Sequence, residues 1–308
     1  MAHIHKNILC VLLAGCLFLV AGCSHIDNNQ ATLEQAATEM EQSEVAEKSA
    51  ETLAESSNEN AKSNNGNGST PVSTSNTPVD VSSDTLEEVS ADCIFSIGIA
   101  CRPSGHLRDL NLRFQAAPLD WMTSHSLGAV AHLFETNFED FFTEIAEVPN
   151  TSGSSHRHVR DTKNDIISMH HFEKGIPLDV AQKQFRETML SRANKVDKIL
   201  KDSTSIALLC NRNKSSAEEL IEFLNRFATV YPDKKITLIN IKDENIRGIQ
   251  KDILLEKDNL KIVQYAFNDK SSGPDSWKGN INIWTAIIKS IKLSDRFINR
   301  EACERVGF

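Results

Sequence analysis

The sequence predicts an α/β domain in which a mostly parallel sheet carries helices on both faces, in three layers, behind a disordered N-terminal tether. A continuous apolar run at 205–210 (SIALLC) and the apolar-rich segments 235–241 (KITLINI) and 260–267 (LKIVQYAF) are typical of strands buried in a parallel sheet. An amphipathic stretch, 215–227, lies between the first two runs. Strand, helix and strand at this spacing indicate parallel β-α-β units. The tether follows from composition, because residues 24–90 contain no aromatic residue.

The elements of the domain follow in chain order from the same periodicities. Pro103 fits the first turn of a helix after the apolar strand 93–97, because the missing proline N–H is not needed there. The helix at 215–227 carries four large apolar residues on one face. The expected strands are 93–97, 165–172, 205–210, 235–241 and 260–267, and the expected helices are 103–112, 126–134, 137–145, 179–200, 215–227 and 282–291, with a loop at 149–157.

The chain begins with the pattern of an exported bacterial lipoprotein. Lys6 precedes an apolar run at 8–20, which has the length of a signal-peptide core and is short for a membrane span. The run ends in LVAGC, which resembles a lipobox and predicts that residues 1–22 are a signal peptide and that Cys23 is acylated. An earlier match ending at Cys16 would leave an apolar segment exposed after cleavage. An uncleaved anchor helix is the remaining alternative.

Acylation of Cys23 implies a lipid-anchored protein of the cell envelope, with the membrane as its first partner. Several acyl chains on one cysteine bind a bilayer durably, because each buried CH₂ contributes about 0.8 kcal/mol. In the lipoproteins that this segment resembles, Ser24 after the cysteine favours the outer membrane where the source has two membranes.

Residues 23–90 are expected to form the tether, and residues 91–308 a single folded domain. The tether carries 13 acidic residues against only Lys48 and Lys62. With the tether and Lys6 of the signal removed, 29 of the 42 acidic and 30 of the 33 basic residues remain for the domain. The domain is therefore close to neutral, and no basic patch indicates a nucleic-acid partner.

Polar residues follow several of the predicted strands at the point where each strand ends. Cys101 comes just after 93–97, and the pair His170 and His171 lies at the end of 165–172. Because ligands of an open parallel sheet bind at the carboxyl ends of its strands, we expect Cys101 and His170 to meet at one edge. Neighbouring side chains of a strand point to opposite faces, so only one of the two histidines can reach Cys101.

Four short blocks, in order along the chain, are similar to a bacterial family of unknown function described as papain-like cysteine peptidases. They are SIGIAC (96–101), APLDW (117–121), NFEDF (137–141) and SMHHF (168–172). The family's pattern begins Ser-Leu-Gly-x-x-Cys, continues with Pro-Phe-Asp-Trp and has a later His-Asp in an apolar strand. This chain has Ile97 for Leu, Leu119 for Phe and His171 for Asp. The resemblance runs from about Cys93 to Leu293 and includes Trp277 and Trp284.

The resemblance implies a cysteine hydrolase in which Cys101 attacks a carbonyl carbon and His170 is the base that takes the thiol proton. Apart from the resemblance, a thiol at a helix N-terminus feels a partial positive charge, which is expected to lower its pKa. We expect Asp120, a charged residue beside Trp121, to orient His170. Asp275 is the alternative third residue, because papain-type peptidases take theirs late in the chain, before a tryptophan.

A disulfide bond is the competing role for Cys101, because cysteines of exported domains are commonly paired. The domain contains Cys93, Cys101, Cys210 and Cys303, which allow three complete pairings. Cys210 lies inside an apolar strand and is expected in the core. A bond between Cys93 and Cys303 would close the two ends of the domain and leave Cys101 free.

The sequence predicts no cofactor and no metal. The SIGIA stretch before Cys101 lacks the further glycines and the lysine of a phosphate-binding loop. His156 and His158 flank Arg157 in a polar loop, and two histidines with no nearby carboxylate or cysteine are more typical of solvated side chains.

Two functions remain open from the sequence. The first is a membrane-anchored thiol hydrolase, a peptidase or amidase, that acts on an envelope protein, peptide or glycan. The second is a non-catalytic envelope lipoprotein whose strand-end crevice binds a glycan, a peptide or a partner protein. The histidine that replaces the family's aspartate at position 171 favours the second function.

Overall fold

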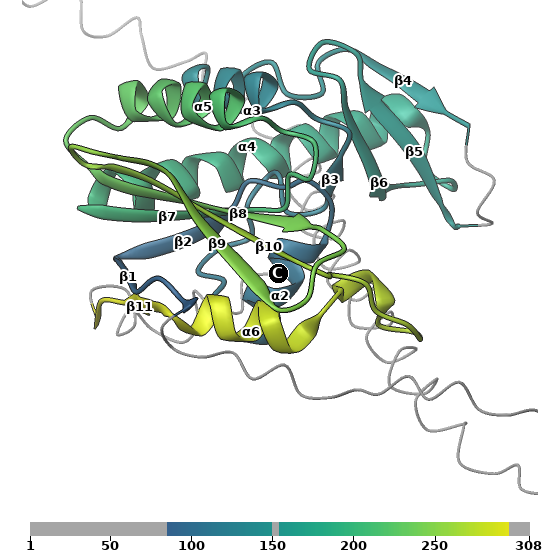
Figure 1. The fold of residues 1–308 in the computed structure, drawn as a ribbon. Coiled ribbons are helices and arrows are strands. Elements are labelled where there is room, and N and C mark those ends of the chain that lie inside the picture. The colour runs from purple at the N-terminus through teal and green to yellow at the C-terminus, as the bar shows by residue number, and fades with distance from the viewer. Residues whose placement is uncertain (1–84, 150–153, 296–308) are drawn as a thin grey trace, which may run out of the picture. The chain divides into compact units, whose positions relative to one another are not determined.

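The computed structural model describes residues 85–149 and 154–295 (Figure 1). The predicted signal peptide, the acylated Cys23, the tether up to residue 84 and Cys303 all lie outside these residues. Within the described residues, no helix is both long enough and apolar enough to cross a membrane.

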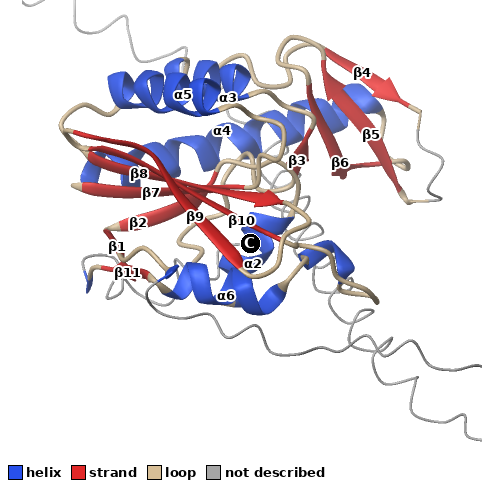
Figure 2. Ribbon diagram, in the orientation of Figure 1, coloured by secondary structure: helices blue, strands red, loops and turns tan. Residues whose placement is uncertain are grey.

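A five-stranded sheet forms the centre of the fold, in the order β2-β7-β8-β10-β9 (Figure 2). Its strands are β2 (Cys93–Ser96), β7 (Ser205–Cys210), β8 (Lys235–Asp243), β10 (Leu260–Phe267) and β9 (Ile249–Lys257). The first four strands are parallel, which confirms the predicted sheet. β9 runs antiparallel to β10 at one edge, so the sheet is mixed. β9 was not predicted, because its mixed polar and apolar residues (IQKDILLEK) leave no fully buried face.

Helices cover both faces of this sheet, which confirms the three-layer prediction (Figure 1). Three helices pack on one face, namely α3 (Leu127–Glu135), α4 (Leu178–Asp202) and α5 (Ala217–Val230). Two helices pack on the other, namely α2 (Arg102–Asp109) and α6 (Ile281–Lys289). The four apolar residues predicted on one face of α5 are all buried. Each face of the sheet therefore has its own apolar core.

A second, antiparallel sheet of four strands lies beside the helices α3 and α4 and was not predicted. Its order is β3-β6-β5-β4, with β3 (Met122–Thr123), β6 (Ile166–Glu173), β5 (His156–Asp161) and β4 (Ile145–Val148). Only β6 was expected as a strand. β5 begins inside the segment that we expected to be a loop. It was missed because its polar sequence, HRHVRD, gives no apolar alternation that would indicate a strand.

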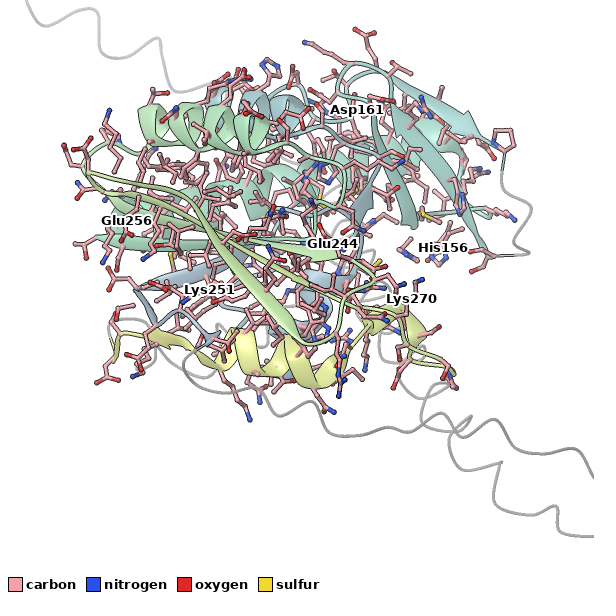
Figure 3. All side chains as sticks on the ribbon, in the orientation of Figure 1. His156, Asp161, Glu244, Lys251, Glu256 and Lys270 are labelled. Carbon is pink, nitrogen blue, oxygen red and sulfur yellow. The ribbon has the colours of Figure 1, made fainter. Side chains whose placement is uncertain are left out.

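The helix expected at 137–145 is wrong, because this segment is a series of turns that leads into β4. Phe138 and Phe142 have positive φ angles, 61° and 53°, which an α-helix does not contain. Both rings are buried, so their helix-like spacing reflects packing into the core. The buried Asp161 carboxylate (Figure 3) accepts a hydrogen bond from the backbone N–H of Phe142 at 2.9 Å, which fixes the turn in place of a helical bond.

The start and the end of the described region pair with each other. β1 (Val89–Ala91) and β11 (Ile291–Leu293) form a small parallel sheet. Just before β1, the Glu87 carboxylate binds the ammonium groups of Lys251 and Lys261 on the central sheet. The folded contacts of this chain therefore begin slightly before residue 91.

Candidate functional site

Cys101 lies at the N-terminus of helix α2, in the position expected for it. The chain leaves β2 at Ser96 and reaches Cys101 through a tight loop in which Gly98 and Ala100 have φ angles of 78° and 66°. A left-handed Ala costs on the order of 1–3 kcal/mol, and such strain persists only where the surroundings impose it. Pro103 follows in the first turn of α2, as predicted. The Cys101 side chain is half-buried.

His170 faces Cys101, with 3.9 Å between the Cys101 Sγ and the His170 Nε2 atoms. His171 points the other way, as expected for neighbours in a strand. Its Nδ1 atom lies 2.9 Å from the Ser168 hydroxyl oxygen, and its ring contacts Phe185. Burial lowers the pKa of His171 to about 3, so this ring is neutral at physiological pH. Of these two histidines, His170 is the one placed to exchange a proton with Cys101.

The two side chains come from different sheets, which differs from the single sheet edge that we expected. Cys101 follows β2 of the central sheet, whereas His170 lies on β6 of the antiparallel sheet. Strand β3 joins the two, because the Met122 carbonyl accepts a hydrogen bond from the Ala100 N–H at 3.0 Å and Met122 pairs with Ser168 on β6. The distance between thiol and imidazole is thus set through β3.

The ionisation of the thiol also differs from the expectation. Burial raises the pKa of the Cys101 thiol above its ordinary value, although its own backbone N–H opposes this shift. In the absence of a substrate the thiol therefore carries its proton at neutral pH. A separation of 3.9 Å is long for a hydrogen bond, and such bonds are often long before a substrate binds. The geometry suits proton transfer to His170 during attack, rather than a preformed thiolate.

We expected Asp120 to orient His170, but the structure shows other partners for its carboxylate. Its carboxylate is buried and accepts hydrogen bonds from the Ser104 hydroxyl, from the Arg113 guanidinium and from the Ala117 N–H, at 2.9–3.0 Å. Among the described residues, its hydrogen bonds go to these three partners. Ser104 belongs to the first turns of α2. Asp120 therefore fixes the helix that carries Cys101.

The alternative third residue, Asp275, has its ion pair with a neighbouring lysine. Its carboxylate is mostly exposed, at 62%, and pairs with Lys278 at 3.6 Å. It precedes a single 3₁₀ turn, η2 (Ser276–Lys278). Although Asp275 precedes Trp277 in the sequence, its carboxylate lies on the surface of the loop that follows β10.

Sequence reasoning gave no role to Asp269. Its carboxylate is buried and binds Arg102, the residue that follows Cys101. Its Oδ2 atom accepts a hydrogen bond from Arg102, the residue after Cys101, at 2.5 Å. Its Oδ1 atom accepts hydrogen bonds from the Asn280 N–H at 2.7 Å and from the Trp284 indole N–H at 2.9 Å. The Trp277 carbonyl also accepts a hydrogen bond from Arg102 at 2.7 Å. The one available signal was the position of Asp269 directly after the apolar strand β10.

The three described cysteines are free thiols. Cys93 is fully buried, with its sulfur 3.2 Å from the Ser203 hydroxyl oxygen, and Cys303, one of its possible disulfide partners, lies outside the described residues. Cys210 is buried in β7, as expected for a core residue. Burial raises the pKa of both Cys93 and Cys210 to about 12. Cys101 is therefore the only one of the three with access to solvent.

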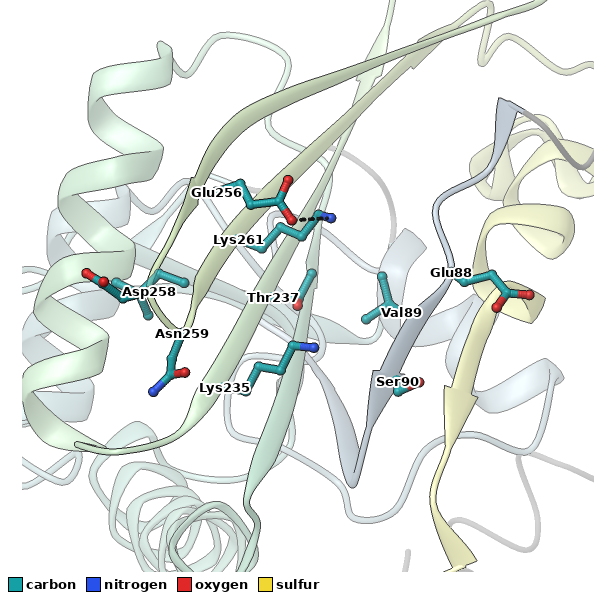
Figure 4. Close-up of a pocket in the computed structure, with 10 residues that line it drawn as sticks. Glu88, Val89, Ser90, Lys235, Thr237, Glu256, Asp258, Asn259 and Lys261 are labelled. Carbon is teal, nitrogen blue, oxygen red and sulfur yellow. Dashed lines mark hydrogen bonds and ion pairs between the residues drawn. The ribbon is translucent and has the colours of Figure 1, made fainter.

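A small surface pocket lies at the other end of the central sheet (Figure 4). Lys235 and Leu260, the first residues of β8 and β10, line it, so it sits at the amino ends of these parallel strands. Glu256 and Lys261, which also line the pocket, form an ion pair at 3.0 Å. Cys101 follows the carboxyl end of β2 and is remote from this pocket. In residues 85–149 and 154–295, no group of three or more potential ligand residues is placed to hold a metal ion.

Comparison with known proteins gives a match to a protein family. Residues 92–242 match the model of a family described as "Putative papain-like cysteine peptidase (DUF1796)". No curated protein and no solved structure matches the chain. The match includes Cys101, Asp120 and His170, and ends at β8. It is shorter than the resemblance that we inferred up to Leu293, and leaves out Asp269 and the two C-terminal tryptophans.

Proposed function

We propose that this chain is a thiol hydrolase, a peptidase or amidase, in which Cys101 is the nucleophile and His170 is the general base. The observation that carries the proposal is the pairing of the Cys101 sulfur with the His170 Nε2 atom, 3.9 Å apart, at the start of helix α2. The family match over residues 92–242 supports the same class of reaction.

The reaction follows from this geometry. The Cys101 sulfur attacks the carbonyl carbon of an amide or ester while its proton passes to His170 Nε2. His170 then gives that proton to the leaving group, and the acyl group stays on the sulfur as a thioester. A water molecule, deprotonated by the same imidazole, hydrolyses the thioester and restores the thiol. The backbone N–H groups of Cys101 and Arg102 stand at the helix start, where no helical acceptor exists, and are suited to stabilise the oxyanion.

An activated ester tests the chemistry without knowledge of the natural substrate. The full chain is mixed with p-nitrophenyl acetate, and we expect release of nitrophenolate together with an acetyl group on the peptide that contains Cys101. Substitution of Cys101→Ala should lower the release about a hundredfold or more, to the rate of the buffer. The control is Cys93→Ser, which changes a buried thiol away from the site.

The test also decides between the two functions. The raised thiol pKa is the observation that favours a binding role without catalysis. A parent chain that releases nitrophenolate no faster than the Cys101→Ala variant would contradict the hydrolase and leave the binding lipoprotein as the better account.

The same proposal includes the location of the enzyme at the cell envelope, where Cys23 is acylated and the residues before 85 form a spacer that holds the domain away from the membrane. Its support is the lipobox-like LVAGC and the acidic composition of the following segment. The substrates would then be envelope proteins, peptides or glycan-linked peptides.

Metabolic labelling tests the anchor. Cells that express the full chain are fed a palmitate analogue, and we expect the label on the parent and its loss from the Cys23→Ser variant. Cys16→Ser is the matched control, since it changes the other lipobox-like cysteine. Label that persists in Cys23→Ser and disappears in Cys16→Ser would show that cleavage occurs at the earlier site.

A further inference from the structure

Arg212 is a buried guanidinium next to the loop that carries Cys101. It lies just after strand β7, which is the neighbour of β2 in the central sheet, and only 5% of its surface is exposed. Its Nη1 atom donates to the His125 carbonyl at 2.6 Å, and its Nη2 atom donates to the Ile97 carbonyl at 3.4 Å. Arg212 thus joins the first residue of the Cys101 loop to the segment between β3 and α3.

The backbone of Arg212 is itself held in place. The fully buried Asn240 side chain, on strand β8, accepts a hydrogen bond from the Arg212 N–H at 2.8 Å. The same side chain donates to the Arg212 carbonyl at 3.4 Å. Because these contacts anchor Arg212 to the central sheet, the guanidinium has a fixed origin from which it reaches Ile97.

His125 completes the contact with the loop. Its Nδ1 atom accepts a hydrogen bond from Arg212 Nη2 at 2.9 Å, so the ring carries its proton on Nε2. The Nε2 atom lies over Gly98, where a Cβ atom would stand only 2.5 Å from it. Gly98 has a φ of 78°, and this combination of close approach and left-handed backbone is possible only for glycine.

The arrangement is expensive for the fold. Within the described residues, no carboxylate forms an ion pair with Arg212, and neither Arg212 Nε nor His125 Nε2 has a hydrogen-bond partner. Buried charges and buried polar atoms are normally paired, because leaving them unpaired is unfavourable. Such exceptions occur where the surrounding structure enforces them, often beside functional sites. Here the two side chains that carry these unpaired atoms lie against the loop of the proposed nucleophile.

We propose that Arg212 and His125 form a clamp that sets the Ile97–Cys101 loop and thereby keeps the Cys101 thiol within reach of His170. Both are positioning residues, and neither touches the thiol. The inference rests on the proposed function, since it assigns to the clamp the alignment of the same nucleophile and base. It adds residues that the sequence analysis did not single out.

The test measures how fast iodoacetamide alkylates Cys101 in the full chain at pH 8, by mass spectrometry of its peptide. We expect His170→Ala to slow the parent about tenfold, as for loss of a general base. Arg212→Met should slow it about tenfold as well, because the thiol leaves the reach of the imidazole. In the Arg212→Met background, His170→Ala should change the rate less than about twofold, because a base that no longer reaches the thiol cannot assist it.

Controls separate positioning from stability. Asp92→Asn weakens the opposite end of β2, where the Asp92 carboxylate accepts hydrogen bonds from Thr204, Ser205 and Ser294, and should lower the melting temperature without slowing Cys101. If Arg212→Met does not fold, His125→Asn replaces it, since the asparagine oxygen keeps an acceptor for Arg212 and only the ring over Gly98 is lost. This variant should slow alkylation severalfold.

The outcomes distinguish the clamp from the proposed function. The clamp alone would be overturned if His170→Ala slows the parent while Arg212→Met and His125→Asn react as fast as the parent and depend on His170 to the same extent. A parent whose Cys101 rate does not depend on His170 would overturn the proposed function, and the clamp with it. If Arg212→Met alkylates slowly and adding His170→Ala still slows it about tenfold, Arg212 acts on stability and not on the alignment of Cys101 with His170.

Discussion

Asp269→Ala is expected to lower the free energy of unfolding by about 3 kcal/mol. The change removes the acceptor of the Trp284 indole N–H and the Asn280 N–H, both of which would then be buried without a partner. It also leaves Arg102 without its carboxylate, and breaking a buried ion pair is commonly more damaging than the pair is worth. Because the Arg102 side chain is 23% exposed, water offsets part of this loss, and we place the effect at the lower end of the usual range.

Urea denaturation of the parent and of Asp269→Ala measures this difference. The matched control is Asp275→Asn on the same loop, which removes an exposed charge paired with Lys278 and should change stability by about 0.5 kcal/mol or less. Equal stability of Asp269→Ala and the parent would mean that the contact between Asp269 and Arg102 of helix α2 does not stabilise the fold. A loss equal to that of Asp275→Asn would give the same answer.

Alkylation of Cys101 in the His170→Ala variant, which has no imidazole to take the thiol proton, is expected to rise about tenfold for each pH unit between pH 6 and 8, or about a hundredfold in total. The thiolate is the reactive form, and burial raises the pKa of this thiol above its ordinary value. The thiolate is therefore scarce at neutral pH and becomes more abundant as the pH rises towards that pKa. The sign is opposite to that of a thiol with a lowered pKa, whose reactivity would already be constant in this range.

Cys93 and Cys210 are internal controls for this profile. Both are fully buried, and burial raises the pKa of each to about 12, so their peptides should stay unlabelled throughout. Labelling of these two residues would show that the chain unfolds during the measurement. A Cys101 rate in His170→Ala that is constant from pH 6 upwards would instead indicate a thiolate already present at pH 6 and contradict the raised pKa of this thiol.

The elements with a uniform environment were predictable from sequence. β7, β8 and β10 are mostly apolar and largely buried because both faces of the sheet are covered, and α5 shows one buried stripe because it lies on that sheet. β4, β5 and β9 are half-exposed and lack either pattern. In 138–142, aromatic residues at helix-like spacing are buried by turns, so the same periodicity produced a wrong helix.

The site shows the same division. Cys101 and His170 could be singled out because residue type and strand position both indicated them, and the structure brings them together. The route of that contact, through β3 to a second sheet, depends on strand pairing that sequence periodicity does not report. Asp120 and Asp269 are both buried carboxylates that bind residues of helix α2, Ser104 and Arg102, and the sequence does not report these partners.

The most direct test of the central claim is the ratio of Cys101 alkylation rates in the parent and in His170→Ala, measured on the full chain at one pH. His171→Ala is the matched comparison, because this neighbouring ring points away from the thiol and binds Ser168. The account predicts that loss of His170 slows Cys101 about tenfold and that loss of His171 slows it much less. Equal rates in the parent and His170→Ala would contradict the assignment of these two residues as nucleophile and base.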